Sequence, residues 1–351
     1  MMDLLGKLAV CNDEVQEMRR EKSIFEYLKS ERKAVVRAMN NNDHEFPTLL
    51  KRLIHISSVQ LDNLSRLNRT HINTMMAVIK VVQQYLGEVE NQGSKEVTAK
   101  QHQLVQVGTL ELLVRLMSWA DLPRKLLLKS LDLGCSILAV AGGYEEAQRR
   151  IYQFLCDSAS SQSFFLVMEN QFKLSSEKLP MLHSAQCDSN NCTADVGLET
   201  LYIESKHSQS KTALENTSKF AVTASEGLSV QEHNVADDLG NCKLFLFWQW
   251  LCEGNYQPNQ HLLRAQPHNP RSINLLALSV TFLSDIAERD LGQVEYLRVA
   301  ISVYNVLCKS VQGACLDNQK CLAFDTELLE TSDHILQQIN GWFCYLVLAL
   351  R

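Results

Sequence analysis

Residues that interrupt helices are scarce in this chain. Its 351 residues include only six prolines and fourteen glycines, and this scarcity favours long helices over many short strands, which need frequent turns. The sequence also lacks a run of about twenty apolar residues, so it predicts no helix that spans a membrane. The closest approach is GWFCYLVLAL, directly before Arg351, which we interpret as the end of a buried helix.

A dominant charge is missing as well. Lysine and arginine number 34 and aspartate and glutamate 40, which gives a net charge of −6. This balance provides no field that would attract nucleic acid or an anionic membrane surface, so we expect neither partner. The first residues, MMDLLGKLAV, have neither the basic start nor the apolar stretch of a signal peptide. We therefore interpret the eleven cysteines as reduced cytosolic thiols, mostly buried as small apolar residues.

Helical periodicity dominates both ends of the chain. In the first third, apolar residues recur at spacings of three and four, and they form two stripes, Ile72, Met75, Ile79, Val82, Leu86 and Leu104, Val107, Leu110, Val114, Met117. Further on, a turn at Leu122-Pro123 and a stop at Gly142-Gly143 predict three successive helices. Because such helix pairs stack and no fixed repeat length recurs, we predict an all-α fold, an irregular α-solenoid of antiparallel helix pairs.

Composition divides this solenoid into two blocks. Between them, residues 175–235 are rich in serine, asparagine, threonine and glutamine and have few aromatic residues. Such a segment buries too little apolar area to offset its chain entropy, so we expect a polar, disordered linker. The predicted organisation is an N-terminal helical segment at 1–100, a solenoid block at 101–174, the linker at 175–235 and a second helical block at 236–351.

The second block begins with LFLFWQWLCEGN, an aromatic helix that should be buried around most of its circumference. After Pro267 and Pro270, two further helical stripes follow, and we expect both to pack on neighbouring helices. Gly313 stands where a glycine would end the second of these helices. The stripes consist of Ile273, Leu276, Val280, Leu283, Ala287 and of Val294, Leu297, Ile301, Tyr304, Cys308, Val311.

The sequence gives enzymatic chemistry no positive support. Cys315 and Cys321 in CLDNQKC lack the second pair that a structural zinc site needs, and the calcium-loop pattern around Asp317 is absent. No histidine lies beside a recognisable nucleophile, and no glycine-rich phosphate loop follows a strand. We therefore predict no catalytic residues, no metal site and no cofactor. A weaker alternative is redox or metal chemistry at Cys308, Cys315 and Cys321.

Several motifs resemble one family in order and separation. LFLFWQWLCEGN, then HLLRAQ, then SVQGACLDNQKCLA are similar to the region before the pore in inositol trisphosphate receptors and ryanodine receptors, over about Val235 to Ala323. A weaker similarity covers about Gln106 to Phe172, including ILAVAGGYEEAQRRIYQFL. The family consists of homotetrameric calcium-release channels of the endoplasmic reticulum. The resemblance implies a cytosolic helical region, including the RIH-associated segment, that couples regulatory domains to the pore.

The resemblance also implies positions for a calcium site. Glu253 and Gln312 match two family positions, but Asn255 replaces a histidine and Lys309 replaces a second glutamate. Calcium needs six to eight oxygen ligands, and the lysine removes one while adding a repulsive positive charge. We therefore expect this degenerate site not to bind calcium by itself. The remaining motif residues form a structural turn, in which Ala314 replaces the family's proline, at Gly313, Cys315, Asn318 and Gln319.

These observations predict a regulatory or coupling segment of a tetrameric calcium-release channel. Its partners would be other regions or subunits of the channel, and it would lie in the cytosol at the endoplasmic reticulum membrane. The sequence holds neither the family's β-trefoil modules nor its six-helix pore, so we expect it to conduct no ions by itself. The alternative is a free-standing α-solenoid scaffold that binds a protein partner.

Overall fold

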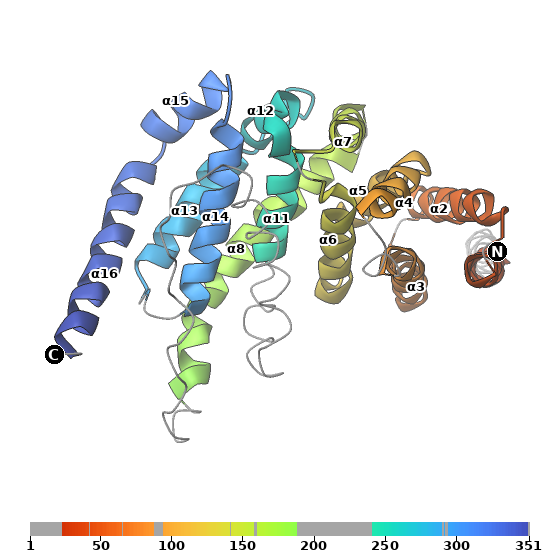
Figure 1. Cartoon of the computed structure of the whole chain (residues 1–351), viewed down its shortest axis with the longest axis horizontal. Helices are drawn as coiled ribbons and strands as arrows, with labels where there is room; N and C mark the ends of the chain where they lie inside the picture. Colours follow the sequence, from red (N-terminus) through yellow and green to blue (C-terminus); the bar gives the residue numbers. More distant parts are fainter. Residues whose placement is uncertain are drawn as a thin grey trace, which may run out of the picture. The chain divides into compact units, whose positions relative to one another are not determined.

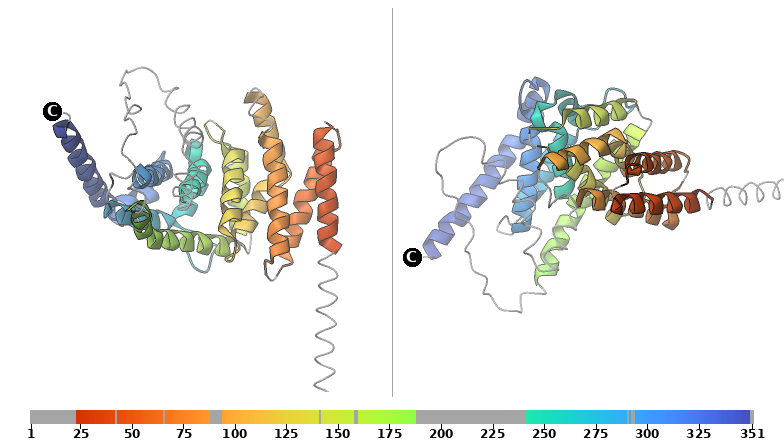
Figure 2. Two further views of the ribbon diagram at one scale, coloured as in Figure 1. Left: turned by 90° about the horizontal axis from the view of Figure 1, so that it is seen from below. Right: turned by 45° about the vertical axis from the view of Figure 1, so that its right-hand side comes forward.

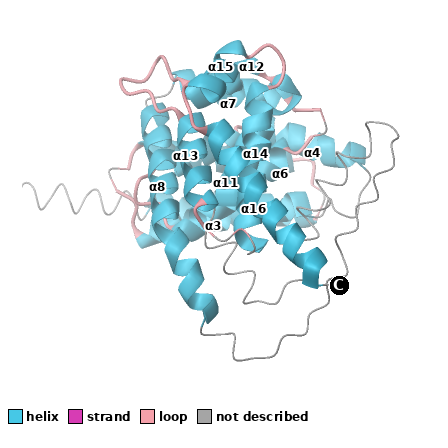
Figure 3. Ribbon diagram, turned by 90° about the vertical axis from the view of Figure 1, so that its left-hand side faces the viewer, coloured by secondary structure: helices cyan, strands magenta, loops and turns pink. Residues whose placement is uncertain are grey.

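The computed structural model of the protein describes residues 23–41, 43–64, 66–87, 94–140, 142–157, 160–187, 241–289, 291 and 294–349. Within these ranges the chain consists of helices, turns and loops without a strand (Figure 3), which confirms the predicted all-α class. The solenoid arrangement stays a prediction. No helix in the described ranges is both long and apolar enough to cross a membrane.

The chain divides into two compact units that interleave in sequence. The first unit comprises Met1–Val167 and Trp250–Ile273, and the second comprises Met168–Gln249 and Asn274–Arg351. The boundaries run through α8 (Ser160–Cys187) and α11 (Asn241–Cys252), so each of these helices contributes to both units. A division by composition could not show this interleaving, because residues 250–273 lie far along the chain from the rest of their unit.

The first unit is built around α5. This helix packs against four others, and α3 also packs against α6, beside which it runs in Figure 2. Residues 23–40 are helical as well. The elements with their bounds are α2 (Phe46–Asp62), α3 (Arg69–Gly87), α4 (Ser94–Gln106), α5 (Thr109–Met117), α6 (Arg124–Leu138), α7 (Glu145–Asp157), the 3₁₀ turn η1 (Glu253–Asn255) and α12 (Gln257–Arg264) (Figure 1).

The helix boundaries predicted for this unit at proline and glycine agree with the structure. Pro123 directly precedes α6, and its φ of −58° suits a helix start. Gly142 and Gly143 have φ values of 83° and 94° and separate α6 from α7, as predicted. Most of the expected stripe residues are buried, and they include Met75, Ile79, Val82, Leu104, Leu110, Val114 and Met117.

The second unit has an aromatic core. Phe172 of α8, Phe245 of α11 and Phe282 of α13 (Leu275–Ala287) lie with ring centroids 5.4 to 6.2 Å apart. α13 in turn packs against each of the three helices that follow it. These helices are α14 (Val294–Val311), α15 (Leu316–Phe324) and α16 (Leu328–Ala349).

Of the two buried apolar stripes predicted for this unit, the one on α13 is buried and the one on α14 is not. On α13 the expected residues are buried, Leu276, Val280, Leu283 and Ala287 among them. On α14 the expected face was wrong, because the buried apolar residues are Tyr296, Val299, Ala300, Val303, Val306 and Leu307. Ile301, at the centre of the predicted stripe, is 51 % exposed, and Cys308 is exposed. α14 is apolar on two adjacent faces, and spacing alone cannot select the one that meets α13.

The first residues of the expected linker are helical. α8 continues to Cys187, so residues 175–187 are helical, whereas 188–235 lie outside the described residues, as do 1–22. The N-terminal half of α8 is anchored by Phe164, Phe165, Met168 and Phe172, all at most 3 % exposed. Once such an anchor has nucleated a helix, each further residue adds a backbone hydrogen bond at little cost, even in a polar sequence.

Candidate functional site

A sharp corner follows the aromatic helix α11. Its last turn leads into η1, where Glu253 is 6 % exposed. Gly254 has a φ of 70° and Asn255 a φ of 61°, a conformation that glycine and asparagine adopt more readily than other residues. The chain then enters α12, which has Pro258 in its first turn. Two of the residues singled out by the sequence, Glu253 and Asn255, therefore lie together at this corner.

Two buried amide side chains hold the corner in place. Gln148 of α7 is 1 % exposed, and its Nε2 donates hydrogen bonds to the carbonyl oxygens of Trp250 at 2.9 Å and Glu253 at 2.8 Å. Asn259 of α12 is 2 % exposed, and its Nδ2 donates to the carbonyl of Leu251 at 3.0 Å. The carbonyl groups of Trp250 and Leu251 belong to the last turn of α11 and have no partner within that helix. The amides therefore satisfy backbone groups that burial would otherwise leave unpaired.

The backbones of the two loops also touch. A Cβ added to Gly143 would lie 2.8 Å from the carbonyl oxygen of Glu253, and one added to Gly254 would meet the carbonyl oxygen of Gly142. Real Cβ atoms do not approach other atoms this closely. The backbone of Gly142-Gly143 therefore packs directly against that of Glu253-Gly254. More than a hundred residues separate the two pairs in sequence. Figure 1 shows the helices that follow them, α7 and α12, next to each other.

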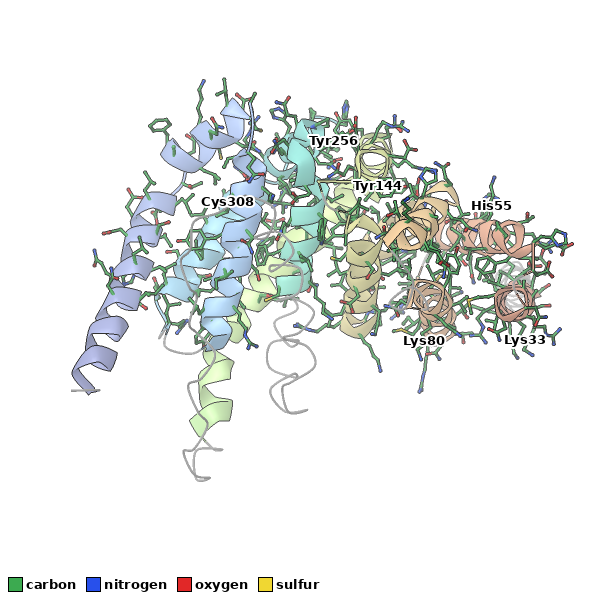
Figure 4. All side chains as sticks on the ribbon, viewed as in Figure 1. Lys33, His55, Lys80, Tyr144, Tyr256 and Cys308 are labelled. Atoms are coloured by element: carbon green, nitrogen blue, oxygen red, sulfur yellow. The ribbon has the colours of Figure 1, made fainter. Side chains whose placement is uncertain are left out.

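The corner carries two tyrosines with perturbed acidity, one in each loop (Figure 4). Burial, followed by the negative charge of Glu146, raises the pKa of Tyr144 above its ordinary value, and its hydroxyl lies 2.8 Å from Nδ1 of His102. Burial, followed by the charge of Glu145, raises the pKa of Tyr256. Both phenols therefore stay neutral at physiological pH.

The other predicted residues gather at the end of α14. Gly313 has a φ of 73°, and the Nε2 of Gln319 donates to the carbonyls of Val311 at 2.9 Å and Gly313 at 3.2 Å. Asn318 donates to the carbonyl of Ser310 at 3.0 Å. These amides hold the last carbonyl groups of α14, as Gln148 does for α11. Lys309 is half-buried in the last turn of α14, and Gln312 next to Gly313 is exposed.

The cysteines of this turn are packed thiols. Cys315 is fully buried before α15, and Cys321 is 3 % exposed and accepts a hydrogen bond from Asn274 at 3.3 Å. Cys308 is exposed on α14 (Figure 4). Within the part of the chain that the structure describes, no three side chains of the histidine, cysteine, aspartate or glutamate type gather as a metal site.

Residues 237–336 match the family model described as RyR and IP3R Homology associated. This matched segment, residues 237–336, is called the homology associated domain. This match confirms the resemblance to the inositol trisphosphate and ryanodine receptor family. The homology associated domain extends from α11 into α16, and so includes both the corner at Glu253 and the turn at Gly313.

The two halves of the expected calcium site belong to different compact units. Glu253 and Asn255 lie in the first unit, whereas Lys309 and Gln312 lie in the second. The degenerate calcium site within the homology associated domain therefore stays a prediction from the resemblance.

The sequence analysis did not predict the role of the two buried amide side chains at the corner, Gln148 and Asn259. Gln148 comes from outside the homology associated domain and Asn259 from inside it, and they meet in one hydrogen-bond network in which Asn259 also donates to the carbonyl of Gln148 at 3.4 Å. One signal was available, since Gln148 follows the Gly142-Gly143 stop and sits among the apolar positions of α7. The partners of Gln148 could not be inferred, because nothing local to α7 specifies them.

Replacing Gln148 by leucine is expected to lower the free energy of unfolding by about 2 to 4 kcal/mol, since one buried and one partly buried carbonyl lose this donor. Gln153 lies on the same helix and is exposed, so Gln153→Leu should change stability by less than about 0.5 kcal/mol. Urea unfolding followed by circular dichroism compares the two variants. Equal stability of both would show that the Gln148 hydrogen bonds contribute nothing to the corner.

Proposed function

We propose that this chain is a cytosolic coupling segment of a calcium-release channel of the inositol trisphosphate and ryanodine receptor type. The observation that carries the proposal is the homology associated domain at 237–336. The segment would contact other regions or subunits of a channel tetramer at the endoplasmic reticulum membrane. It would take part in gating by passing on movements and not by conducting ions.

The corner at Glu253 supports this role. Residues 143–148 lie outside the homology associated domain, yet their backbone and Gln148 contact the domain at Trp250, Glu253 and Gly254. A contact with no room for an added methyl group transmits displacement, because neither backbone can yield without the other. Coupling additionally requires two alternative packings whose balance a ligand shifts. In this proposal α7 and α12 move together as a rigid body when the chain changes from one packing to the other.

Sequencing the transcript beyond the codon for Arg351 tests this proposal against its main alternative. The channel proposal expects an open reading frame that continues into six apolar spans. A stop codon directly after Arg351 would instead support a free-standing scaffold that binds a protein partner. That alternative is favoured by one observation, the exposed apolar face of α14 and α16.

We further expect the chain to bind no calcium at micromolar concentrations. Lys309 stands where the family has a carboxylate, so one oxygen ligand is lost and a positive charge is added, and calcium affinity rises with the charge of its ligands. Isothermal titration of the whole chain with calcium chloride should show no saturable heat. Tight binding that Glu253→Gln abolishes would refute this expectation.

A further inference from the structure

An apolar groove runs between α14 and α16. In Figure 1, α15 bridges the upper ends of these two helices, which run in opposite directions. The groove has a volume of about 270 Å³ and is lined from α14 by Leu297, Ala300, Ile301 and Tyr304 and from α16 by Ser332, Ile335, Leu336 and Ile339. Ile301 is 51 % exposed and Leu336 58 %. Soluble surfaces seldom leave such contiguous large apolar residues uncovered without a binding role.

The groove is a poor site for a small molecule. Its two polar side chains bind each other, since the hydroxyl of Tyr304 donates to Oγ of Ser332 at 2.9 Å. Ser332 in turn donates to the carbonyl of Leu328 at 2.6 Å. No polar group is therefore directed at a ligand from the lining, and the volume lies below the roughly 300–1,000 Å³ of typical ligand pockets. Apolar side chains of a polypeptide suit this lining better.

The lining residues follow the spacing of a coiled-coil seam. On α14 the lining residues Leu297, Ile301 and Tyr304 are followed at the same spacing by Cys308, and on α16 Ser332, Leu336 and Ile339 are preceded at the same spacing by Leu329. Spacings alternate between three and four on both helices, which is how two helices present holes for the side chains of a third. From Leu297 to Cys308 the seam extends about 17 Å at 1.5 Å per residue. That length matches about three turns of a docked helix.

The α14 side and the α16 side of the groove carry opposite charge. On each helix the residues on one side of the seam are buried in the core. They are represented by Ala300 on α14 and Ile335 on α16, both at most 4 % exposed. The other flank carries basic residues on α14, Arg298 and Lys309, and acidic residues on α16, Glu330 and Asp333. A docked helix would therefore meet positive charge along one side and negative charge along the other.

We propose that this groove binds an amphipathic α-helix of another polypeptide chain. The helix presents leucine-like residues at heptad spacing, acidic residues toward α14 and basic residues toward α16. A second copy of this chain fits less well, because the same patch on both copies would place groove against groove. A single helix is convex and fills the groove. This inference rests on the second unit alone and holds whether or not the chain is part of a channel.

The test uses a synthetic helical peptide as the probe. It is fluorescein-labelled and about two heptads long, close to the length of the seam, with leucine at the two seam positions of each heptad, glutamate along one flank and lysine along the other. Two control peptides carry lysine, or glutamate, on both flanks. Fluorescence anisotropy with the full chain should show saturable binding of the mixed peptide. Both control peptides should bind several-fold more weakly, with the difference shrinking as salt rises from about 0.05 to 0.5 M.

Matched variants locate the binding surface. Leu336→Asp should weaken binding of the mixed peptide about tenfold or more, whereas Phe324→Asp should leave it unchanged. Phe324 is 84 % exposed and does not line the groove. Both sites are exposed, so circular dichroism should show unaltered helicity in each variant. Arg298→Glu should weaken binding of the mixed peptide and improve that of the lysine-flanked one.

Three outcomes would overturn the proposal. They are absence of saturable binding, equal binding by Leu336→Asp and the unmodified chain, and self-association of the chain that Leu336→Asp abolishes. The last outcome would assign the groove to a second copy. None of these results bears on calcium release, so failure of the groove proposal is distinguishable from failure of the channel proposal.

Discussion

Gly254→Ala is expected to destabilise the first unit by at least about 2 kcal/mol, from two additive sources. The alanine side chain disfavours the φ of 70° at this position by roughly 1–2 kcal/mol. Its Cβ would also overlap the carbonyl oxygen of Gly142, which forces the α7 and α12 loops apart. Because this overlap is with backbone and not with a flexible side chain, the loops cannot relax without losing the Gln148 hydrogen bonds.

Two glycine controls separate these sources. Gly142 has a φ of 83° but open space around an added Cβ, so Gly142→Ala should cost only the roughly 1–2 kcal/mol of backbone strain. Gly87 has open space around an added Cβ and is the last residue of α3, so Gly87→Ala should change stability by less than about 0.5 kcal/mol. Urea unfolding midpoints should follow the order Gly87→Ala, Gly142→Ala, Gly254→Ala. If Gly254→Ala were no worse than Gly142→Ala, the two loops would not touch in solution.

Phe282→Ala is expected to cost about 3–5 kcal/mol, the largest effect of any single truncation proposed for this chain. Phe282 is 1 % exposed, and its ring lies 6.0 Å from that of Phe245 and 6.2 Å from that of Phe172. Removing it leaves a cavity where α8, α11 and α13 join. Partial refilling by Phe282→Leu should reduce the loss to about 1.5 kcal/mol or less.

Phe324 provides the matched control for this truncation. It is the same residue type in the same unit but is 84 % exposed, so Phe324→Ala should change stability by less than about 0.5 kcal/mol. Thermal unfolding followed by circular dichroism at one protein concentration measures all three variants. A Phe282→Ala variant as stable as Phe324→Ala would mean that the three rings do not form a common core.

The sequence predicted best where both apolar faces of a helix are buried. On α13 the spacing of Leu276, Val280 and Leu283 identified one buried face, and the adjacent face, which includes Phe282 and Ile286, is buried as well. On α14 the same reasoning chose the face of Ile301, while Tyr296 and Val303 are the residues that pack against the core. Two apolar faces on one helix cannot be ranked by spacing, since the choice depends on where the neighbouring helices lie.

The candidate site shows the same limit. Glycines were predicted at the ends of helices because they mark turns locally, and Gly142, Gly143 and Gly313 do adopt positive φ values. That Gly143 meets Glu253 depends on tertiary contact across more than a hundred residues, and so does the bonding of Gln148. Such pairings are set by the packing of α7 against α12 and leave no periodic signal in either segment.

The most direct test of the coupling role measures calcium release from the endoplasmic reticulum. Cells that lack their own release channels receive the full transcript, and a lumenal calcium indicator records the response to inositol trisphosphate or ryanodine. The account predicts that the transcript restores release and that Gln148→Leu reduces it at equal protein abundance, while Gln153→Leu does not. Failure of the unmodified transcript to restore release, or normal release by Gln148→Leu, would contradict it.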